Sequence, residues 1–330
     1  LIDLGLETGL NFGISTKYWA EQMGLPFHPT HIQRGNQFDR RHGYSDLLVY
    51  PQRHKMNWRL WNGGTTRLLL WGDPDYARRF MASAGIYSSD GYEVNEPLAT
   101  KMLGQPHDAP VFDILRPQYR YYEYEFERYW HFFQVFGRLG YNPETPAEVW
   151  SREFERRFGG EASASIAEAL HRASKVLPRI VAYCMPAGKF PTTRGWAERQ
   201  RMDDLPAYAK ADPSDTQQFL SFAEAAQSLL DGKPSAKIHP LATARWFENT
   251  AKEVLGAAGE AEAKAVRSKE LVSTLIDLRI LANLALYHAR RIPAGLSYAL
   301  YEKTGDLNAL DDAIAHERRA ITAWEGIVSA

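Results

Sequence analysis

Cysteine is nearly absent from this sequence. Cys184 is the single one among 330 residues, so no disulfide can form within the chain. It lies in a helical pattern, where a cysteine usually serves as a small buried apolar residue. Thiol chemistry would depend on this one residue and is therefore disfavoured. One cysteine leaves the compartment open, and a periplasmic or extracellular location is favoured if the protein is bacterial.

Surplus charge and long apolar runs are absent as well. The net charge is −1, and without a basic excess we expect no nucleic-acid partner. No apolar run approaches the roughly 18–20 residues that span a bilayer, so we expect no membrane partner. The first ten residues lack an initiating Met and the basic-then-apolar pattern of a signal peptide. We read the chain as a processed or truncated piece of a longer protein.

Several motifs of binding and catalysis are missing. No glycine-rich phosphate loop occurs, so we predict no nucleotide and no other cofactor. The absence of a G-x-S-x-G turn disfavours a serine hydrolase. His28 and His31 have the spacing of a metal-ligand pair, but Pro29 prevents a regular helix between them. We therefore predict no metal site.

The two halves of the chain differ in their sequence patterns, and we place the boundary between residues 116 and 117. Residues 1–116 contain short apolar runs bounded by Gly and Pro: one at "NFGISTKYW", a clearer one at 65–71, and a third at "DGYEVNEP". A helical pattern covers 75–84. Strands that alternate with helices favour βα units around a parallel sheet. We predict an α/β region here, a partial or complete (β/α) barrel.

Residues 117–330 read as an all-α region, a helical bundle. An aromatic helix is predicted over 119–136, with Tyr122, Phe126, Tyr129, Phe133 and Phe136 on one face. Thr145, Pro146 and Glu148 predict a capped helix start, and a helix over 164–184 should kink at Pro178. Further helices are predicted near 214–231, 241–257, 261–291 and 308–328, the last pair joined at 305–306.

Acidic side chains follow the predicted strands, where ligands bind in parallel α/β folds. Asp73 follows the second strand, and Glu93 and Glu96 lie at the end of the third. Glycoside cleavage needs two carboxyl groups about 5–9.5 Å apart, a gap that neighbouring strand ends can span. We predict Asp73, Glu93 and Glu96 as the source of the general acid and base. Asp73 as a helix cap, and the two glutamates as surface ion pairs, remain the alternatives.

Other side chains of the predicted strand ends and loops suit a carbohydrate. Sugars offer flat apolar faces to Trp and Tyr rings, and hydroxyl groups to amide, imidazole and charged groups. Trp58 is a further aromatic candidate, although core packing is the alternative for any one Trp. The predicted substrate-binding residues are Lys17, Tyr18, Trp19, Glu21, His28, His31, Arg40, Trp61, Asn62, Arg67, Trp71 and Asn95.

The order of these segments, from "STKYWAEQMGLPFHPTHI" through "RLLLWGDPDYARRF" and "GYEVNEPLATKM" to "GYNPETPAEVWSREFERRFG", resembles the C-terminal part of α-glucuronidase-like glycoside hydrolases over residues 10–185. The resemblance implies a (β/α)₈ barrel followed by a helical domain, with activity on uronic-acid-decorated plant or algal polysaccharides. It also implies that Lys17, Arg67 or Arg40 pairs with a substrate carboxylate. An upstream segment or a second chain would then complete the barrel.

The leading hypothesis is therefore a glycoside hydrolase acting on an acidic or plant-type polysaccharide. A non-catalytic glycan-binding or scaffold protein would use the same aromatic residues without a matched carboxyl pair. A polysaccharide lyase would instead use Tyr18, His28 and His31. The sugar, the linkage and the stereochemical outcome stay open.

Overall fold

The computed structural model describes residues 2–17, 53–60, 72–83, 85, 89–94, 117–183, 204–211, 213 and 218–330. Within these ranges one sheet occurs, and helices account for 71% of the residues. The sheet is parallel and has the strand order β1-β2-β3. Its strands are β1 (Gly13–Lys17), β2 (Lys55–Leu60) and β3 (Ser89–Val94).

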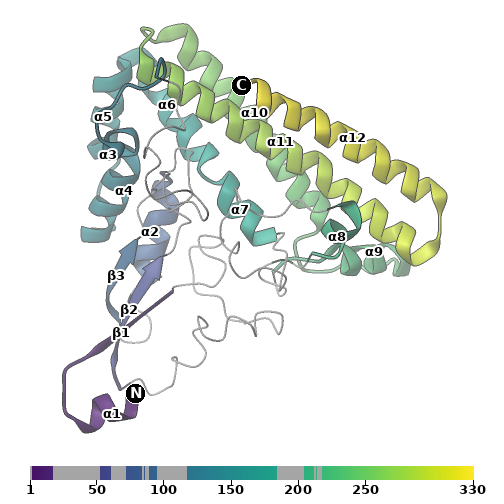
Figure 1. Cartoon of the computed structure of the whole chain (residues 1–330), viewed down its shortest axis with the longest axis horizontal. Coiled ribbons are helices and arrows are strands. Elements are labelled where there is room, and N and C mark those ends of the chain that lie inside the picture. Colours follow the sequence, from purple (N-terminus) through teal and green to yellow (C-terminus); the bar gives the residue numbers. More distant parts are fainter. Residues whose placement is uncertain are drawn as a thin grey trace.

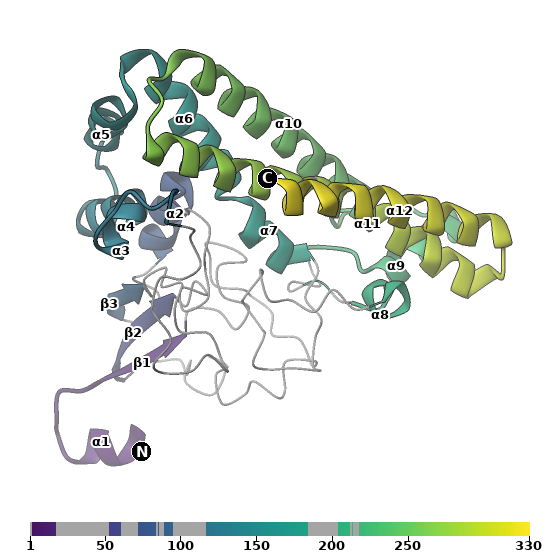
Figure 2. The same ribbon diagram turned by 45° about the horizontal axis from the view of Figure 1, so that its top comes forward.

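The helices of the described residues fall into a short N-terminal set and a long C-terminal set. In both views the three longest, α10, α11 and α12, run side by side, and the sheet lies at the other end of the molecule near the N-terminus (Figures 1 and 2). The helices are α1 (Ile2–Glu7), α2 (Pro74–Ser83), α3 (Glu125–Arg128), α4 (Trp130–Tyr141), α5 (Glu148–Phe158), α6 (Gly160–Ala173), α7 (Val176–Tyr183), α8 (Leu205–Ala209), α9 (Phe222–Asp231), α10 (Pro240–Lys264), α11 (Lys269–Thr304) and α12 (Leu307–Ser329).

The predicted barrel is wrong for the described part of the chain. Three parallel strands do not form a closed or half-closed barrel, which needs many more βα units. Strands were predicted at β1 and β3, and the structure confirms both. The predicted strand at 65–71 lies outside the described residues. The error came from treating a single βαβ unit as evidence for a repeated one.

Strand β2 was not predicted, although its sequence alternates. Met56 and Trp58 are fully buried, while Lys55 between the buried His54 and Met56 is exposed. This period of two is the signature of a strand with one covered face. The Lys and Arg residues between the apolar residues obscured this alternation in the sequence. Trp58 is therefore a core residue and cannot stack on a sugar.

The covered face of the sheet packs against α2 and α4. The rings of Phe80 on α2 and Tyr92 on β3 meet edge to face at 5.9 Å between centroids. A Cβ atom at Gly140 on α4 would stand 1.5 Å from the Tyr92 hydroxyl oxygen, so only glycine fits there. One continuous hydrophobic core extends from Met56 through the helices to Ala299.

Two of the predicted helices are each interrupted once in the structure. The aromatic helix is interrupted at Tyr129, and Phe126 and Phe133 of the predicted buried face are exposed. The helix predicted over 164–184 is interrupted at 174–175 instead of at Pro178. A proline ring clashes with the carbonyl four residues earlier, which is that of Ser174, and this explains the position of the break.

Capping predictions had mixed outcomes. Thr145 does not cap α5, because its hydroxyl donates to the carbonyls of Arg138 and Asn142. Gly159 ends α5 with φ of 83°, a positive value that favours glycine. Gly305 ends α11 with φ of 71°, and the Asp306 carboxylate then accepts the backbone N–H of Asn308 to begin α12.

One helix of the described residues, α11, is long and apolar enough to cross a membrane by length and composition alone. Of its most apolar stretch, 61% is buried inside the protein. That burial is the behaviour of a core helix, since α10 and α12 cover it along its length (Figure 1).

Candidate functional site

The end of the sheet where parallel strands finish carries a row of charged positions. Lys17 of β1 pairs in register with Arg59 of β2, and Arg59 pairs with Glu93 of β3. Because successive residues of a strand point to opposite faces, Glu93 lies on the face opposite to that of its neighbour Tyr92. Glu93 is half-buried. Across the described sheet the order of these positions is therefore Lys17, Arg59 and Glu93, with the predicted acid on the edge strand β3.

Helix α2 begins at this same end of the sheet. The chain leaves β2 at Leu60, enters α2 at Pro74, and reaches the start of β3 only six residues after Ser83. Because β2 and β3 are parallel, α2 must carry the chain back to the starting edge. Its first residues, including Asp73, therefore lie toward the edge where the strands end. That Asp73 and Glu93 act as a carboxyl pair stays a prediction.

Most predicted site residues lie outside the described residues. Asp73 and Glu93 are described in full, and Lys17 is described by its backbone. Their roles remain predictions, as do those of the rest of the set. The predicted residues that lie outside are Glu96, Tyr18, Trp19, Glu21, His28, His31, Arg40, Trp61, Asn62, Arg67, Trp71 and Asn95.

Asp73 is buried, with 5% of its surface exposed. Its Oδ1 accepts the backbone N–H of Asp75 at 3.1 Å, which satisfies one of the open donors at the start of α2. Burial raises the pKa of Asp73 to about 6, although the nearby Lys175 ammonium and the backbone N–H groups of Tyr76 and Asp75 oppose the rise. The carboxyl group therefore combines a cap geometry with a pKa suited to proton donation.

The segment before α2 is fastened to the helical region through Gly72. Its backbone N–H donates to Ser174 Oγ at 2.9 Å, and that hydroxyl donates to the Leu170 carbonyl at 2.7 Å. A Cβ atom on Gly72 would lie 2.4 Å from Cδ2 of His131. The position of Asp73 is thus set by residues one hundred positions away in the chain.

A histidine pair lies beside this junction. His131 Nε2 of α4 and His171 Nε2 of α6 are 2.9 Å apart, and the two rings are stacked. Burial, followed by the charge of Lys175, lowers the pKa of His171 to about 4. Burial also lowers the pKa of His131. Both imidazoles are therefore neutral at pH 7, and one ring donates its proton to the other.

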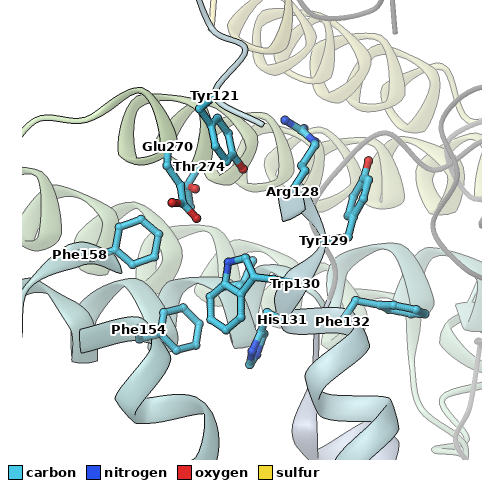
Figure 3. A pocket seen from close by; sticks show the side chains of 11 residues that line it. Tyr121, Arg128, Tyr129, Trp130, His131, Phe132, Phe154, Phe158, Glu270 and Thr274 are labelled. Carbon is cyan, nitrogen blue, oxygen red and sulfur yellow. The ribbon is translucent and has the colours of Figure 1, made fainter. Parts of the chain in front are cut away.

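A hollow between α3, α4, α5 and α11 contains about 320 Å³ of empty volume, open solvent included. Figure 3 shows Trp130 at its centre, with Glu270 and Tyr121 on the far side from Phe154. Arg157 lies over the Trp130 ring at 4.7 Å and bonds to Glu270 at 2.8 Å. Because the Arg157 guanidinium covers the Trp130 ring, a sugar cannot stack on that ring. The hollow is therefore a gap in the packing between helices.

Arg128, one of the residues that line this hollow, forms a buried ion pair. Arg128 Nη2 of α3 lies 2.6 Å from Asp277 Oδ2 of α11, and its Nη1 donates to Ser273 Oγ at 3.2 Å. Breaking such a pair leaves one buried charge alone, which is costly. The pair therefore fixes α3 against α11 and serves structure.

Sequence analysis did not identify the residues around the junction that precedes α2. His131, His171 and Ser174 interrupt apolar stretches of helical pattern, and that signal marks buried polar groups. It does not say which groups meet, because His131 and His171 are forty residues apart. Among the described residues, no group of three or more His, Cys, Asp or Glu side chains could hold a metal ion.

Comparisons with known proteins add one finding about the fold. No family model matches the chain, and no curated protein matches it. Among solved structures the chain is similar to a GH138 enzyme targeting pectin rhamnogalacturonan II, with a TM-score of 0.72 and 13% sequence identity. The match covers 99% of this chain but 38% of that one, so the chain spans well under half of its structural neighbour.

At this identity the likeness shows the fold alone. The chain shares the fold of the matched part of that GH138 enzyme, and its own activity as a glycoside hydrolase stays a prediction. The finer part, a specific likeness to α-glucuronidases, is not shown.

Proposed function

We propose that the chain is part of a glycoside hydrolase that acts on an acidic plant polysaccharide. The observation that supports this most is the structural similarity to an enzyme that targets pectin, over 99% of the chain. Because the chain spans 38% of that enzyme, the activity and substrate of the whole protein belong to the proposal.

In the proposed reaction, carboxyl groups at the strand ends supply the general acid and the general base or nucleophile. One must be protonated and the other ionised at working pH. Asp73, with a pKa raised to about 6 by burial, is the candidate acid. Glu93, or Glu96 three residues later, is the candidate base. In the register of the sheet, the Glu93 position of β3 pairs with that of Arg59 on β2.

Amide substitutions test these roles on the full chain with rhamnogalacturonan II and pectin as substrates. Asp73→Asn, Glu93→Gln and Glu96→Gln remove each ionisable group with little change in shape. Loss of the acid or the base should reduce kcat/KM about 100-fold or more, because general acid–base catalysis contributes that much. Released reducing ends measure the activity. Asp90→Asn is the matched control, since Asp90 is an exposed acid of the same strand as Glu93.

The Asp73 variant also separates the acid from the helix cap. Asn caps a helix about as well as Asp, so a cap role leaves activity and stability near wild type. An acid role removes activity while the fold stays intact. It also predicts that wild-type activity falls as the pH rises above about 6, where the raised pKa of Asp73 loses its proton.

Three other outcomes would contradict the proposal. Full activity in all three variants would remove the carboxyl assignment. Binding of the polysaccharide without release of reducing ends would favour a glycan-binding protein. Products that absorb ultraviolet light, from a new double bond, would favour a lyase.

A further inference from the structure

Helix α12 buries small residues and exposes most of its large apolar ones. Its buried residues are three alanines, at positions 313, 320 and 323. It packs against α11 and lies at the edge of the three long helices in both views (Figures 1 and 2). A surface helix ordinarily turns its large apolar side chains toward the core, so the arrangement in α12 calls for a reason. The exposed large residues are Leu307, Ile314, Ile321, Trp324 and Val328.

Four of these residues recur at intervals of seven positions and form a row along α12, which we call the outer stripe. Leu307, Ile314, Ile321 and Val328 are 67%, 40%, 52% and 77% exposed, respectively. Single exposed apolar residues are common on protein surfaces. A seven-residue repeat is different, because it is the spacing by which one helix packs along another. The outer stripe therefore has the pattern of a helix–helix contact.

A row of charged residues borders the outer stripe. Asp311, Arg318 and Glu325 each follow a stripe residue by four positions, so they lie on the same side of the helix. All three are exposed. Among the described residues, the ion pair of α12 joins Glu317 to Arg291 on α11 and includes none of these three. The row reads acid, base, acid, and a complementary partner needs opposite charges at the same spacing.

A second copy of α12 offers those charges when it runs antiparallel about a twofold axis beside Ile321. Arg318 then lies opposite Glu325 of the partner subunit, and the symmetry makes this contact twice. Ile314 lies beside Val328 of the partner subunit, and the two copies of Ile321 meet at the axis. A parallel pair in register would place Arg318 against its own copy, and like charges in contact are unfavourable. The charge row therefore favours the antiparallel arrangement.

We propose that the outer stripe is a homodimer interface in which α12 pairs antiparallel with α12 of a second copy. The overlap runs from Ile314 to Val328, a length of about 21 Å at 1.5 Å per residue. One helix face of this length is at the small end of specific interfaces, so a Kd in the micromolar range is expected. The dimer does not depend on the proposed function, because it involves none of the candidate catalytic residues.

Sedimentation velocity of the full chain tests the dimer at about 1–200 µM, a range that brackets a micromolar Kd. The apolar test is Ile321→Lys, and its matched control is Leu229→Lys on α9, where the leucine is 51% exposed. The charge test consists of Arg318→Glu, Glu325→Arg and the double variant that exchanges both. Its control is Arg319→Glu, which makes the same change on the opposite side of α12. Circular dichroism shows that each variant is folded.

Wild type should pass from monomer to dimer as its concentration rises. Ile321→Lys should raise Kd about 10-fold or more, because it buries an unpaired charge at the axis. Arg318→Glu and Glu325→Arg should each weaken the dimer about 10-fold, since each places like charges opposite one another at two contacts. The double variant should regain the wild-type Kd. Both controls should dimerise as wild type does.

Three results would overturn the proposal. A wild type that stays monomeric over the whole range would assign the outer stripe to a partner other than a second copy. Unchanged dimerisation of Ile321→Lys would place the dimer interface elsewhere on the molecule. A double variant as weak as the single variants would show that Arg318 does not face Glu325, as in a dimer whose axis lies at Ile314 and pairs Arg318 with Asp311.

Discussion

Gly72 is the residue on which the contact between sheet and helices depends most closely. It donates its N–H to Ser174 on one side and faces the His131 ring on the other. Its neighbour Asp73 begins α2 and is a candidate for the chemistry. A change of one methyl group at Gly72 therefore tests whether the helices position the candidate acid.

Gly72→Ala is expected to destabilise the protein by about 1–3 kcal/mol, the usual cost of forcing atoms into a packed interior. The added Cβ would stand 2.4 Å from His131 Cδ2, and the buried ring must move. Urea unfolding measures the free energy. Gly137→Ala on α4 is the control, because nothing lies within 4 Å of a Cβ there, and the added methyl should stabilise that helix slightly.

A second substitution tells steric conflict from a backbone effect. If the His131 ring is the obstacle, Gly72→Ala should cost much less in a His131→Ala background, and the cycle should show coupling of this pair. Additive costs would mean that the glycine is needed for another reason.

Single residues were predictable where the signal is local. The sequence around Asp73 places an acid directly before a proline, which is the pattern of a helix start, and α2 begins there. The surroundings of Asp73 were not predictable, because they include the charge of Lys175 and the Ser174 hydroxyl bonded to Gly72, both from the second half. Arg179 carries no local signal at all; its contacts with the Phe219 and Trp246 rings exist only in the folded chain.

Helices α4 and α6 meet through the His131–His171 pair, and this contact should be sensitive to acid. A histidine with a lowered folded pKa contributes stability above its unfolded pKa of about 6.5, and this contribution is lost as the pH falls toward the folded value. For His171 that value is about 4. The groups that face it are His131 and Lys175, and protonation would add a positive charge beside the latter.

Between pH 7 and pH 5, the free energy of unfolding should fall by about 2 kcal/mol more in the wild-type protein than in His171→Gln. This is the difference that proton linkage gives for the shift in the His171 pKa. Urea unfolding at several pH values measures it. His316→Gln on α12 is the comparison: its imidazole is half-buried and its pKa is lowered less, so its effect should be smaller. Parallel pH curves for wild type and His171→Gln would contradict the burial of a neutral pair.

At the level of elements, the long helices were predicted best. The turn between α11 and α12 was predicted at its glycine, because Gly305 and Asp306 carry strong end and start signals. Strand β2 was missed and the barrel was wrong, since pairing between distant strands has no local code. A single βαβ unit looks the same in sequence whether or not more units follow.

In the described residues, the larger hydrophobic cluster contains residues from both sides of the predicted boundary. Met56 and Trp58 of β2 and Phe80 of α2 belong to the same hydrophobic cluster as the helices after residue 117. A boundary between 116 and 117 stays a prediction about chain organisation. The continuous core implies that the two regions depend on each other for stability, because neither buries its apolar face without the other.

The described regions should therefore unfold together. Tryptophan fluorescence, which includes the buried Trp58, and far-ultraviolet circular dichroism of the helices should give coincident urea transitions. Gly72→Ala should lower both midpoints equally, although it lies on the sheet side. Amide hydrogen exchange gives the local test: opening of β2 and of α10 should speed up together in this variant. Two separate transitions, or faster exchange in β2 with α10 unchanged, would mean that Gly72 only joins two independent units. The helices would then not set the position of Asp73.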